Sequence, residues 1–540
     1  MTHLNYSNQH KVACIGIGGG GVFYVAKFFV KLGVQVYGFD LQESERTKEL
    51  QSLGVRITFA NPTKALEPGT SLFVYSPGLP NPILQELEKH NGNIPHQDVG
   101  AFTTKLIHDY EENLLNEQEK TAFLASDIAP LFSLNQSKMT YIAVTGTDGK
   151  TTTCAMIYHI LRKLGYKPGL ISTVSAKVGD KDIDTGFHTT TPSSQELFKL
   201  LKLMEKEHCT HAIVEATSHG LAMGRLAGLK FNAIAYTNIT SEHIDYHKTW
   251  THYYLAKETL LTEHTTSRSI VVLNKDDKRA FPLLEQKAKA LARDIISYSL
   301  TPKTLAMVTA TDITENPTIS FVINKQSQTI IPILGRYNIS NALAAITLIS
   351  RLENKQVSET ASLLGNFQTV TGRMQIIQSS PFTVIIDFAH TANALEEALR
   401  STRKILPKSK KLIVVFGCAG KRDDSKREPM GSVAGEHADI TILTAEDPRT
   451  EKLIAINDAI EVGWKITATS EKVLYRFDDD SQHANIRRQA IAKAISLAKK
   501  GDVILITGKA HEQSLCFDNI EYPWTDITET MKLLRTLKVS

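Results

Sequence analysis

The run over residues 141–153, YIAVTGTDGKTTT, constrains the fold of this chain more than any other feature. Its apolar start, residues 141–145, has the composition of a buried strand, and a helical pattern follows from about residue 155. Gly146 and Gly149 allow a tight turn between the two. The backbone N–H groups of such a turn point inward and form an anion nest, and the helix N-terminus adds partial positive charge. The sequence therefore predicts a strand–turn–helix unit that binds an anionic ligand.

Lys150 and Thr151, which follow the turn, indicate that the anion is a phosphate group. Lys150 can reach the β- and γ-phosphates of a nucleotide, and the hydroxyl of Thr151 can bind Mg²⁺. The first glycine of the usual P-loop pattern is Val144 here. We expect a nucleoside triphosphate at this loop; the alternative is a Gly-rich turn without a ligand.

Composition limits the classes of protein to consider. The 540 residues are enough for about three or four domains. A content of 42% hydrophobic and 22% charged residues is that of a soluble globular protein, and a net charge of +4 is small for this length and argues neither for nor against nucleic acid as a partner. The five cysteines show no C-x-x-C spacing, which favours reduced thiols. No run approaches the roughly 20 apolar residues of a membrane span, and no signal peptide is evident. We expect a cytoplasmic, monomeric enzyme with no membrane or nucleic-acid partner.

The N-terminal segment has a second glycine turn. An apolar strand over 11–15 leads into Gly16, Gly18 and Gly21, at the G-x-G-x-x-G positions, and a second strand ends at Asp40. This pattern is typical of dinucleotide-binding folds, but any diphosphate can use such a turn. NAD therefore remains an alternative for this segment.

Apolar runs that alternate with helical stretches predict a doubly wound α/β fold throughout. The further strands are expected over 71–75, 212–215, 233–236, 269–273, 383–387, 411–416, 440–443 and 503–506. We predict three domains: a Rossmann-like domain over 1–104, a central P-loop ATPase-type domain over 139–370 and a C-terminal Rossmann-like domain over 371–540. A polar, acidic linker is expected over 105–138.

Several ionisable residues follow the glycine loop in the sequence. Glu215 ends a predicted strand, where a carboxylate commonly helps to hold Mg²⁺ in P-loop folds. His219, His243 and His247 follow, and Lys257 comes soon after. Single histidines are more often structural, but several beside a P-loop favour a catalytic site.

Together these motifs resemble those of the Mur ligases, the ATP-dependent amide-forming enzymes that build the peptidoglycan stem peptide. The resemblance spans essentially the whole chain and rests on the runs 145–152, 190–192, 215–219, 237–238, 242–247, 274–277, 335–342, 372–373, 387–390, 417–427, 447–449 and 508–512. It implies that ATP phosphorylates a substrate carboxylate and that an incoming amine then attacks the acyl phosphate. Such chemistry needs positive charge and alignment rather than an enzymic nucleophile.

The resemblance assigns residues to ATP and Mg²⁺, the expected cofactors. It implies catalytic roles for Lys150, Glu215, His243 and Lys257. It implies metal binding by Thr151, Glu215, His243 and Lys257, the last once carbamylated; a salt-bridging lysine is the alternative. The residues implied to bind ATP are Thr145, Gly146, Thr147, Asp148, Gly149, Lys150, Thr151, Thr152, Asn338, Asn341, Arg373, Asp387 and His390.

Within the family, the central and C-terminal motifs are most similar to members that add the third residue of the stem peptide. The N-terminal motifs are instead similar to members that add alanine to UDP-N-acetylmuramate. The implied partners are UDP-N-acetylmuramoyl-L-alanyl-D-glutamate and a diamino acid. The residues implied to bind the UDP-substrate are Gly16, Gly18, Gly21, Asp40, Ser76, Thr190, Thr191, Thr217, Ser218 and Arg225.

Diaminopimelate-adding relatives carry an Arg at the position of Arg449 that lysine-adding relatives lack, so the resemblance implies meso-diaminopimelate as the amino acid. A guanidinium pairs bidentately with a carboxylate, which lysine lacks at its distal end. Arg422, Gly508 and Glu512 match other positions around that ligand. Asp447 departs from the Asn of diaminopimelate-adding relatives and can partly neutralise Arg449. Lysine, another Mur step, and amide ligases of the folylpolyglutamate synthase or cyanophycin synthetase type remain alternatives, as does a regulatory nucleotide-binding protein. Ala510 replaces a Gly of the family pattern, where a positive φ is expected.

Overall fold

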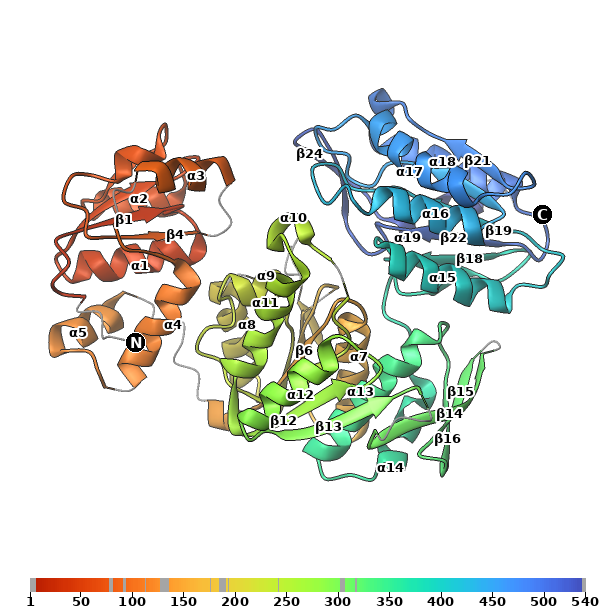
Figure 1. The fold of residues 1–540 in the computed structure, drawn as a ribbon, viewed down its shortest axis with the longest axis horizontal. Helices are drawn as coiled ribbons and strands as arrows, with labels where there is room; N and C mark the ends of the chain where they lie inside the picture. Colours follow the sequence, from red (N-terminus) through yellow and green to blue (C-terminus); the bar gives the residue numbers. More distant parts are fainter. Residues whose placement is uncertain are drawn as a thin grey trace. The chain divides into compact units, whose positions relative to one another are not determined.

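The computed structural model describes residues 6–76, 81–90, 94–111, 113–126, 136–174, 176–183, 191–192, 194–240, 242–301, 306–315 and 318–536 (Figure 1). The chain divides into two compact units. The first comprises Met1–Ala143, Tyr166–Asn232 and Ala256–Ser269, and the second comprises Val144–Gly165, Ala233–Leu255 and Ile270–Ser540. Within the described ranges, no helix is long and apolar enough to span a bilayer.

The N-terminal part is a five-stranded sheet with the order β3-β2-β1-β4-β5, and all its neighbours are parallel. Its strands are β1 (Lys11–Ile15), β2 (Gln35–Phe39), β3 (Arg56–Thr58), β4 (Leu72–Tyr75) and β5 (His96–Asp98). Its helices are α1 (Gly20–Lys31), α2 (Glu45–Ser52), α3 (Asn81–His90), α4 (Val99–Glu111) and α5 (Glu117–Ala125). Since the chain leaves β1 toward β2 and returns on the other side as β4, the turn after β1 lies at a topological switch point, where ligands bind in such folds.

Helices α4 and α5 occupy much of the segment for which we expected a linker, 105–138. Leu106, Ile107, Leu115 and Phe123 belong to the same buried cluster as the α1 residues Phe28 and Phe29. Two of its acidic residues are buried as well: Asp109 accepts from the hydroxyl of Tyr6 at 2.7 Å and Glu119 from the N–H of Ser7 at 2.9 Å, so this segment completes the N-terminal core. The domain boundaries themselves stay predictions.

The central sheet has eleven strands in the order β16-β15-β14-β13-β12-β11-β6-β10-β7-β8-β9. Its strands are β6 (Thr140–Thr145), β7 (Pro168–Ile171), β8 (Ala176–Val178), β9 (Lys181–Ile183), β10 (His211–Glu215), β11 (Phe231–Tyr236), β12 (Thr265–Asn274), β13 (Asp294–Ser299), β14 (Val308–Glu315), β15 (Ile319–Ile323) and β16 (Ser327–Ile331). The accompanying helices are α7 (Lys150–Lys163), α8 (Ser194–Lys206), α9 (Ser218–Ala222), α10 (Ile244–His247), α11 (Trp250–Thr262), α12 (Ala280–Ala290), α13 (Tyr337–Leu352) and α14 (Val357–Ser362). Antiparallel hairpins form both ends of this sheet.

The C-terminal part has a six-stranded sheet, β17-β18-β22-β19-β20-β21, in which only β17 is antiparallel to its neighbour. Its strands are β17 (Gln375–Gln378), β18 (Thr383–Asp387), β19 (Leu412–Phe416), β20 (Ile440–Leu443), β21 (Val473–Arg476) and β22 (Val503–Thr507), with a separate hairpin of β23 (Ser514–Phe517) and β24 (Ile520–Pro523). Its helices are α15 (Ala392–Ile405), α16 (Arg427–His437), α17 (Leu453–Thr467), α18 (Ala484–Leu497) and α19 (Asp526–Thr536). Short 3₁₀ turns lie at Pro62–Ala65, Gln136–Lys138, Leu363–Asn366 and Asp480–Gln482.

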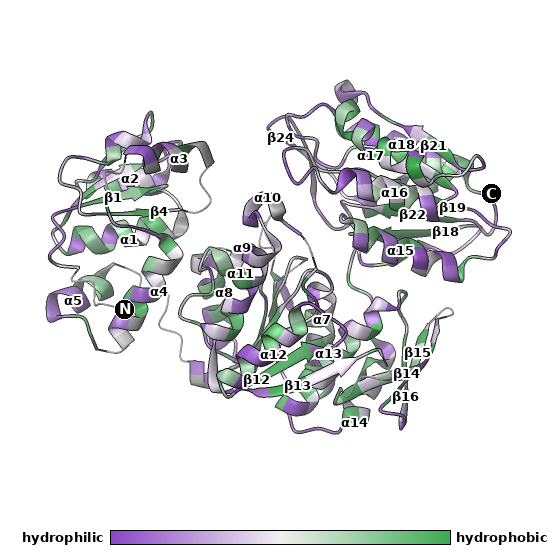
Figure 2. Ribbon diagram, viewed as in Figure 1, coloured by the Kyte–Doolittle hydropathy of each residue, from purple (hydrophilic) through white to green (hydrophobic). Residues whose placement is uncertain are grey.

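The strands of each sheet carry the apolar core. Figure 2 shows hydrophobic residues along β4 and β18, for example. In the C-terminal part, successive residues of β19 alternate between two buried clusters, with Val414 in one and Val415 in the other. Helices cover both faces of this sheet, and its strands are therefore continuous apolar runs in the sequence. The predicted α/β fold class is confirmed.

Candidate functional site

The glycine loop between β6 and α7 is held in a conformation that only glycine allows. Gly149 has φ of 83°. A Cβ there would lie 2.1 Å from Oδ1 of Asn341, and one on Gly146 would lie 1.8 Å from Oγ1 of Thr237. The backbone N–H of Thr147 donates to the carbonyl of Asn238 at 2.7 Å. The side chains of Thr237 and Asn238 also donate to the carbonyl of Asp148, so the loop keeps its shape through close contacts of its own backbone with neighbouring polar groups.

Lys150 folds back over this loop. Its Nζ donates to the carbonyls of Gly146 at 3.0 Å and Thr147 at 2.7 Å. A phosphate group that approaches the loop meets an ammonium already in place. Arg373 adds a second cation, because its Nη2 donates to the hydroxyl of Thr151 at 3.3 Å. The loop, Lys150 and Arg373 are thus brought together as the sequence predicts for a phosphate site.

A charged group surrounds the loop within the second unit. Glu242 lies 3.4 Å from Nε2 of His390 and 3.7 Å from Nε2 of His243. Burial raises the pKa of Glu242, but the nearby His243, His390 and Lys150 outweigh it and hold that pKa well below its usual range. Burial works against a charged His390, yet its hydrogen bond to Glu242 raises the pKa of His390. This arrangement favours an ionised pair of Glu242 and His390.

Asp148, in the loop itself, has a raised pKa, in contrast to Glu242. Burial, and then the charge of Glu242, raise the pKa of Asp148. Its carboxylate accepts a hydrogen bond from Nδ2 of Asn393 at 3.1 Å. Asn393 and Tyr253, whose hydroxyl lies 3.0 Å from Oγ1 of Thr147, were not among the predicted ATP-binding residues. Their only sequence signal is proximity to the predicted motifs.

The asparagines and the aspartate predicted to bind ATP have structural contacts of their own. Nδ2 of Asn338 donates to the carbonyl of Leu334 at 2.6 Å, and Nδ2 of Asn341 donates to Oδ1 of Asn338 at 3.0 Å. Asp387 accepts from the backbone N–H groups of Met374 and Ala389, at 2.7 and 2.8 Å. It therefore positions the backbone beside Arg373 and beside His390.

Four predicted residues meet in the first unit. Both carboxylate oxygens of the buried Glu215 accept from Thr173, at 3.0 Å each. The hydroxyl of Thr191 donates to the carbonyl of Glu215 at 2.8 Å and accepts from the backbone N–H of Thr217 at 3.0 Å. The guanidinium of Arg225 donates to the carbonyl of Thr191.

The other residues predicted near this group are placed separately. Ser218, at the start of α9, and Lys257, on α11, are buried. Thr190 lies outside the described residues. In the part of the chain that the structure describes, no three His, Cys, Asp or Glu side chains form a metal-binding group.

The N-terminal glycine turn is closed by an acid. Gly16 has φ of 75°, and the backbone N–H of Gly18 donates to Oδ2 of Asp40 at 2.7 Å. The other oxygen of Asp40 accepts from the backbone N–H of Leu41 at 2.7 Å. The N–H of Ser76 donates to the carbonyl of Ile15 at 2.9 Å, which places Ser76 at the same end of the sheet. Gly21 lies against α4, because a Cβ added to Gly21 would be 3.0 Å from the side chain of Val99.

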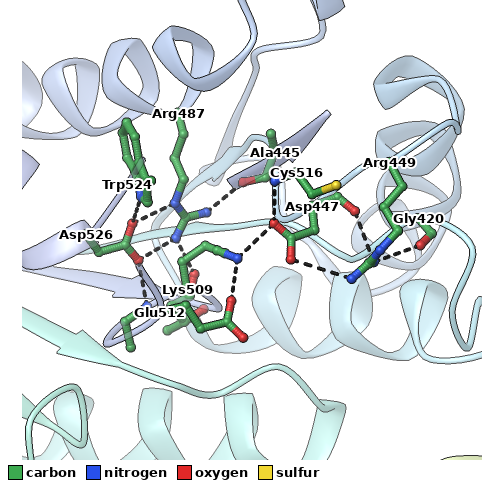
Figure 3. Close-up of polar contacts among 12 residues, drawn as sticks. Gly420, Ala445, Asp447, Arg449, Arg487, Lys509, Glu512, Cys516, Trp524 and Asp526 are labelled. Carbon is green, nitrogen blue, oxygen red and sulfur yellow. Dashed lines mark hydrogen bonds and ion pairs between the residues drawn. The ribbon is translucent and has the colours of Figure 1, made fainter. Parts of the chain in front are cut away.

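A network of charges forms a separate site in the C-terminal part (Figure 3). Nη1 of Arg449 donates to the carbonyls of Gly420 at 3.0 Å and Asp447 at 3.4 Å. Oδ1 of Asp447 accepts from Nζ of Lys509 and from the N–H of Cys516, both at 2.8 Å. Lys509 also pairs with Glu512. Three of the predicted amino-acid-binding residues, Asp447, Arg449 and Glu512, thus belong to one network.

The remaining predicted residues of this site differ in their surroundings. Gly508 has φ of 106°, and a Cβ there would lie 2.5 Å from Oε2 of Glu446. Arg422 is exposed on the loop after β19. Ala510 has φ of 39°, so the positive φ expected at this position is confirmed.

Two further groups in this region escaped prediction from sequence. Arg487 is fully buried and pairs with both oxygens of Asp526 at 2.7 Å. It donates to the carbonyls of Ala445 and Thr507 at 2.9 and 2.7 Å, and so holds together the two segments that carry Arg449 and Lys509. Glu446 is buried, and no hydrogen bond from a described residue reaches its Oε2. Burial, which outweighs the nearby Lys426 and His390, raises the pKa of Glu446.

Comparison with protein families finds three matches along the chain. The Mur ligase family catalytic domain matches residues 11–111, the Mur ligase middle domain matches 144–349, and the Mur ligase glutamate ligase domain matches 372–510. A UDP-N-acetylmuramoyl-L-alanyl-D-glutamate–2,6-diaminopimelate ligase of Cytophaga hutchinsonii is 35% identical over 404 residues, which cover 74% of this chain and 79% of the relative.

Solved structures show the same fold. A structure of a UDP-N-acetylmuramoyl-L-alanyl-D-glutamate–2,6-diaminopimelate ligase matches 94% of this chain and 93% of its own, with a TM-score of 0.53 and 23% identity. A UDP-N-acetylmuramate–alanine ligase from Thermotoga maritima matches 98% of this chain and 99% of its own, with a TM-score of 0.50 and 19% identity.

Proposed function

Because the chain belongs to the Mur ligase family and is an ATP-dependent ligase, we propose that it adds meso-diaminopimelate to UDP-N-acetylmuramoyl-L-alanyl-D-glutamate. In this reaction a carboxylate of the UDP-linked dipeptide attacks the γ-phosphorus of ATP, which forms an acyl phosphate and releases ADP. The amine of the diamino acid then attacks the acyl carbon, and phosphate leaves. The proposed role of the chain is to align these groups and to stabilise negative charge.

The proposed ATP site is the glycine loop with Lys150 and Arg373. Lys150 now donates to two loop carbonyls, and phosphate oxygens would take over these hydrogen bonds. Backbone N–H groups of the loop and the N-terminus of α7 would bind the phosphates. Asn338, Asn341, Asp387 and His390 are proposed on family resemblance to lie around the nucleotide.

Mg²⁺ is the proposed metal, and its preference for oxygen ligands is compatible with the residues present. The hydroxyl of Thr151 and the carboxylate of Glu215 offer oxygen ligands, which Mg²⁺ prefers. Glu215 is buried and its orientation is held by Thr173. By family resemblance, His243 and a carbamylated Lys257 would support the metal. Bound Mg²⁺ would neutralise phosphate charge.

We infer that the N-terminal glycine turn binds the UDP-substrate rather than NAD. In NAD-binding folds the acid at the position of Asp40 hydrogen-bonds to the ribose. Here both oxygens of Asp40 accept backbone N–H groups, so Asp40 holds the turn, and the choice of the UDP-substrate is supported by the match of residues 11–111 to the Mur ligase family. The domain boundaries given above, cytoplasmic location and a monomeric state remain part of the proposal.

One observation in the C-terminal part carries the choice of amino acid. Nη1 of Arg449 is anchored on two backbone carbonyls, whereas no described residue accepts a hydrogen bond from its Nη2, which has only a long ion pair with Oδ2 of Asp447 at 3.7 Å. A side chain held in this way presents one edge of a guanidinium to a carboxylate. Diaminopimelate has a carboxylate at its distal end, and lysine does not.

The test is phosphate release from ATP by the full chain with UDP-N-acetylmuramoyl-L-alanyl-D-glutamate and, in separate reactions, meso-diaminopimelate, lysine and ornithine. We expect turnover that depends on the UDP-substrate and is fastest with diaminopimelate. Faster turnover with lysine would contradict the proposed amino acid while leaving the ligase reaction in place.

A further inference from the structure

Lys509 is a buried cation with no role in the function proposed so far. Only 2% of its side chain is exposed, compared with 28% for Arg449 and 39% for Glu512. Burial disfavours a charged lysine, but Glu512 and Asp447 raise its pKa above the ordinary value. A buried ammonium kept charged by two carboxylates needs a reason, because burying charges is costly unless they are paired.

The distances around Asp447 supply this reason. Oδ1 of Asp447 accepts two hydrogen bonds at 2.8 Å, from Nζ of Lys509 and from the N–H of Cys516. Oδ2 lies 3.7 Å from Nη2 of Arg449, which is too long for a hydrogen bond. Asp447 is thus held toward Lys509, although Arg449 is close enough to compete for it.

We propose that Lys509 is a positioning residue that restricts the Asp447 carboxylate to a long ion pair with Arg449, and so keeps the hydrogen bonds of the Arg449 guanidinium available for the distal carboxylate of the incoming diamino acid. This inference rests on the proposed function. It also explains how the chain tolerates Asp447 beside a site for an anion, since Lys509 supplies the compensating charge.

The geometry indicates what the loss of Lys509 would do. Without its ammonium, the Asp447 carboxylate would keep one backbone N–H and have Arg449 as its nearest remaining cation in this network. A small rotation would let both carboxylate oxygens pair with the guanidinium, because this bidentate geometry is the one that Arg prefers. The substrate carboxylate would then have to displace Asp447.

A double-mutant cycle in the full chain tests the proposal. Lys509→Gln, Asp447→Asn, the double variant and Lys509→Arg are compared with wild type for KM and kcat toward meso-diaminopimelate, ATP and the UDP-substrate. Lys472→Gln is the control, because Lys472 is a part-buried lysine of the C-terminal part that lies outside this network and donates to the carbonyls of Gly435 and Glu436. Thermal unfolding of each variant reports whether it folds.

We expect Lys509→Gln to raise the KM for diaminopimelate about tenfold, with the KM for ATP changed less than about twofold, and the added Asp447→Asn to reverse most of this rise. Lys509→Arg should retain a low KM, since it keeps a cation. If Lys509→Gln does not fold, the folded double variant decides: a KM near that of wild type supports the proposal, and a tenfold rise overturns it.

Two other outcomes separate the inference from the proposed function. An unchanged KM in folded Lys509→Gln, or a double variant as impaired as Lys509→Gln alone, overturns the role of Lys509 only. Wild type that shows no turnover with diaminopimelate overturns the proposed function, and the inference with it.

Discussion

The glycine loop and the Arg449 network are both suited to bind anions, but they are built differently. The loop is one short stretch of chain, and its shape depends on contacts of its backbone with Thr237 and Asn238 and on glycine at two positions. The Arg449 network joins the segment of Asp447 and Arg449 to that of Lys509 and Glu512, about 60 residues later, and it depends on paired charges. A triphosphate is common to all members of an ATP-dependent family, whereas the amino acid differs between members. The region that must vary is thus built from paired side-chain charges, whereas the loop adds the side chains of Lys150 and Arg373 to a backbone turn.

Lys150→Ala should break the loop side of this comparison and have the largest effect. Removal of the ammonium over the loop should lower kcat/KM for ATP by on the order of 10²–10³. Lys163→Ala, at the exposed other end of α7, is the control and should be close to wild type. Phosphate release measures both. A folded Lys150→Ala variant within about tenfold of wild type would refute the loop assignment.

Arg449→Ala should break the other side, with an effect confined to the amino acid. The loss of a bidentate partner for a buried carboxylate costs about 2–5 kcal/mol, so the KM for diaminopimelate should rise steeply while the KM for ATP stays the same. Arg400→Ala, which removes a surface pair with Glu396, is the control. Equal weakening of diaminopimelate and of any lysine activity would show that Arg449 does not read the distal carboxylate.

Gly18→Ala should sharpen the comparison, because the N-terminal turn is also built from backbone. A Cβ there would lie 3.0 Å from Oγ of Ser44 and 3.1 Å from Oδ2 of Asp40, so these side chains must give way. We expect the KM for the UDP-substrate to rise by a factor that corresponds to roughly 1–2 kcal/mol of lost binding free energy. The KM for ATP should stay the same and serves as internal control. A change in ATP kinetics instead would contradict a UDP site at this turn.

The smallest effect concerns pH and the pair of Glu242 and His390. The raised pKa of His390 gives stability that is complete below the usual value of 6.5 and is lost as pH rises through the raised value. The lowered pKa of Glu242 gives stability that is complete above the usual value of 4.5 and is lost as pH falls through the lowered value. Because the pair is partly exposed, its contribution should be below about 1 kcal/mol.

The measurement is the midpoint of thermal unfolding of wild type and His390→Gln from pH 4 to pH 9. The difference between them should be largest between pH 4.5 and 6.5 and should shrink at alkaline pH. His10→Gln, at an exposed position, is the control. A difference that grows with rising pH would show that the pair is not ionised as described.

The sequence predicted those parts of the molecule in which local pattern determines geometry. The strand before Gly146 and the N-terminal glycine turn follow from apolar runs, glycines and their spacing. The helix after the loop follows from the same pattern, although it begins at Lys150 rather than near the expected residue 155. The α/β class follows from the same patterns. The segment 105–138 shows the limit, because acidic residues suggested a linker while Leu106 and Phe123 complete a core with residues of α1. Composition averages over the two faces of a helix, so it did not reveal this packing.

Only the tertiary structure decided which charges meet. The sequence places Asp447 two residues before Arg449 and so suggests that the first neutralises the second. In the fold, Lys509 follows β22 and its ammonium donates a hydrogen bond to the Asp447 carboxylate. The buried Arg487 donates to the carbonyls of Ala445 and Thr507, and so connects the segments that carry Asp447 and Lys509. Local patterns determine strands, turns and helix starts because they act through neighbouring backbone. The balance of charge at a site depends on residues tens of positions apart, and these become neighbours only when the sheet forms.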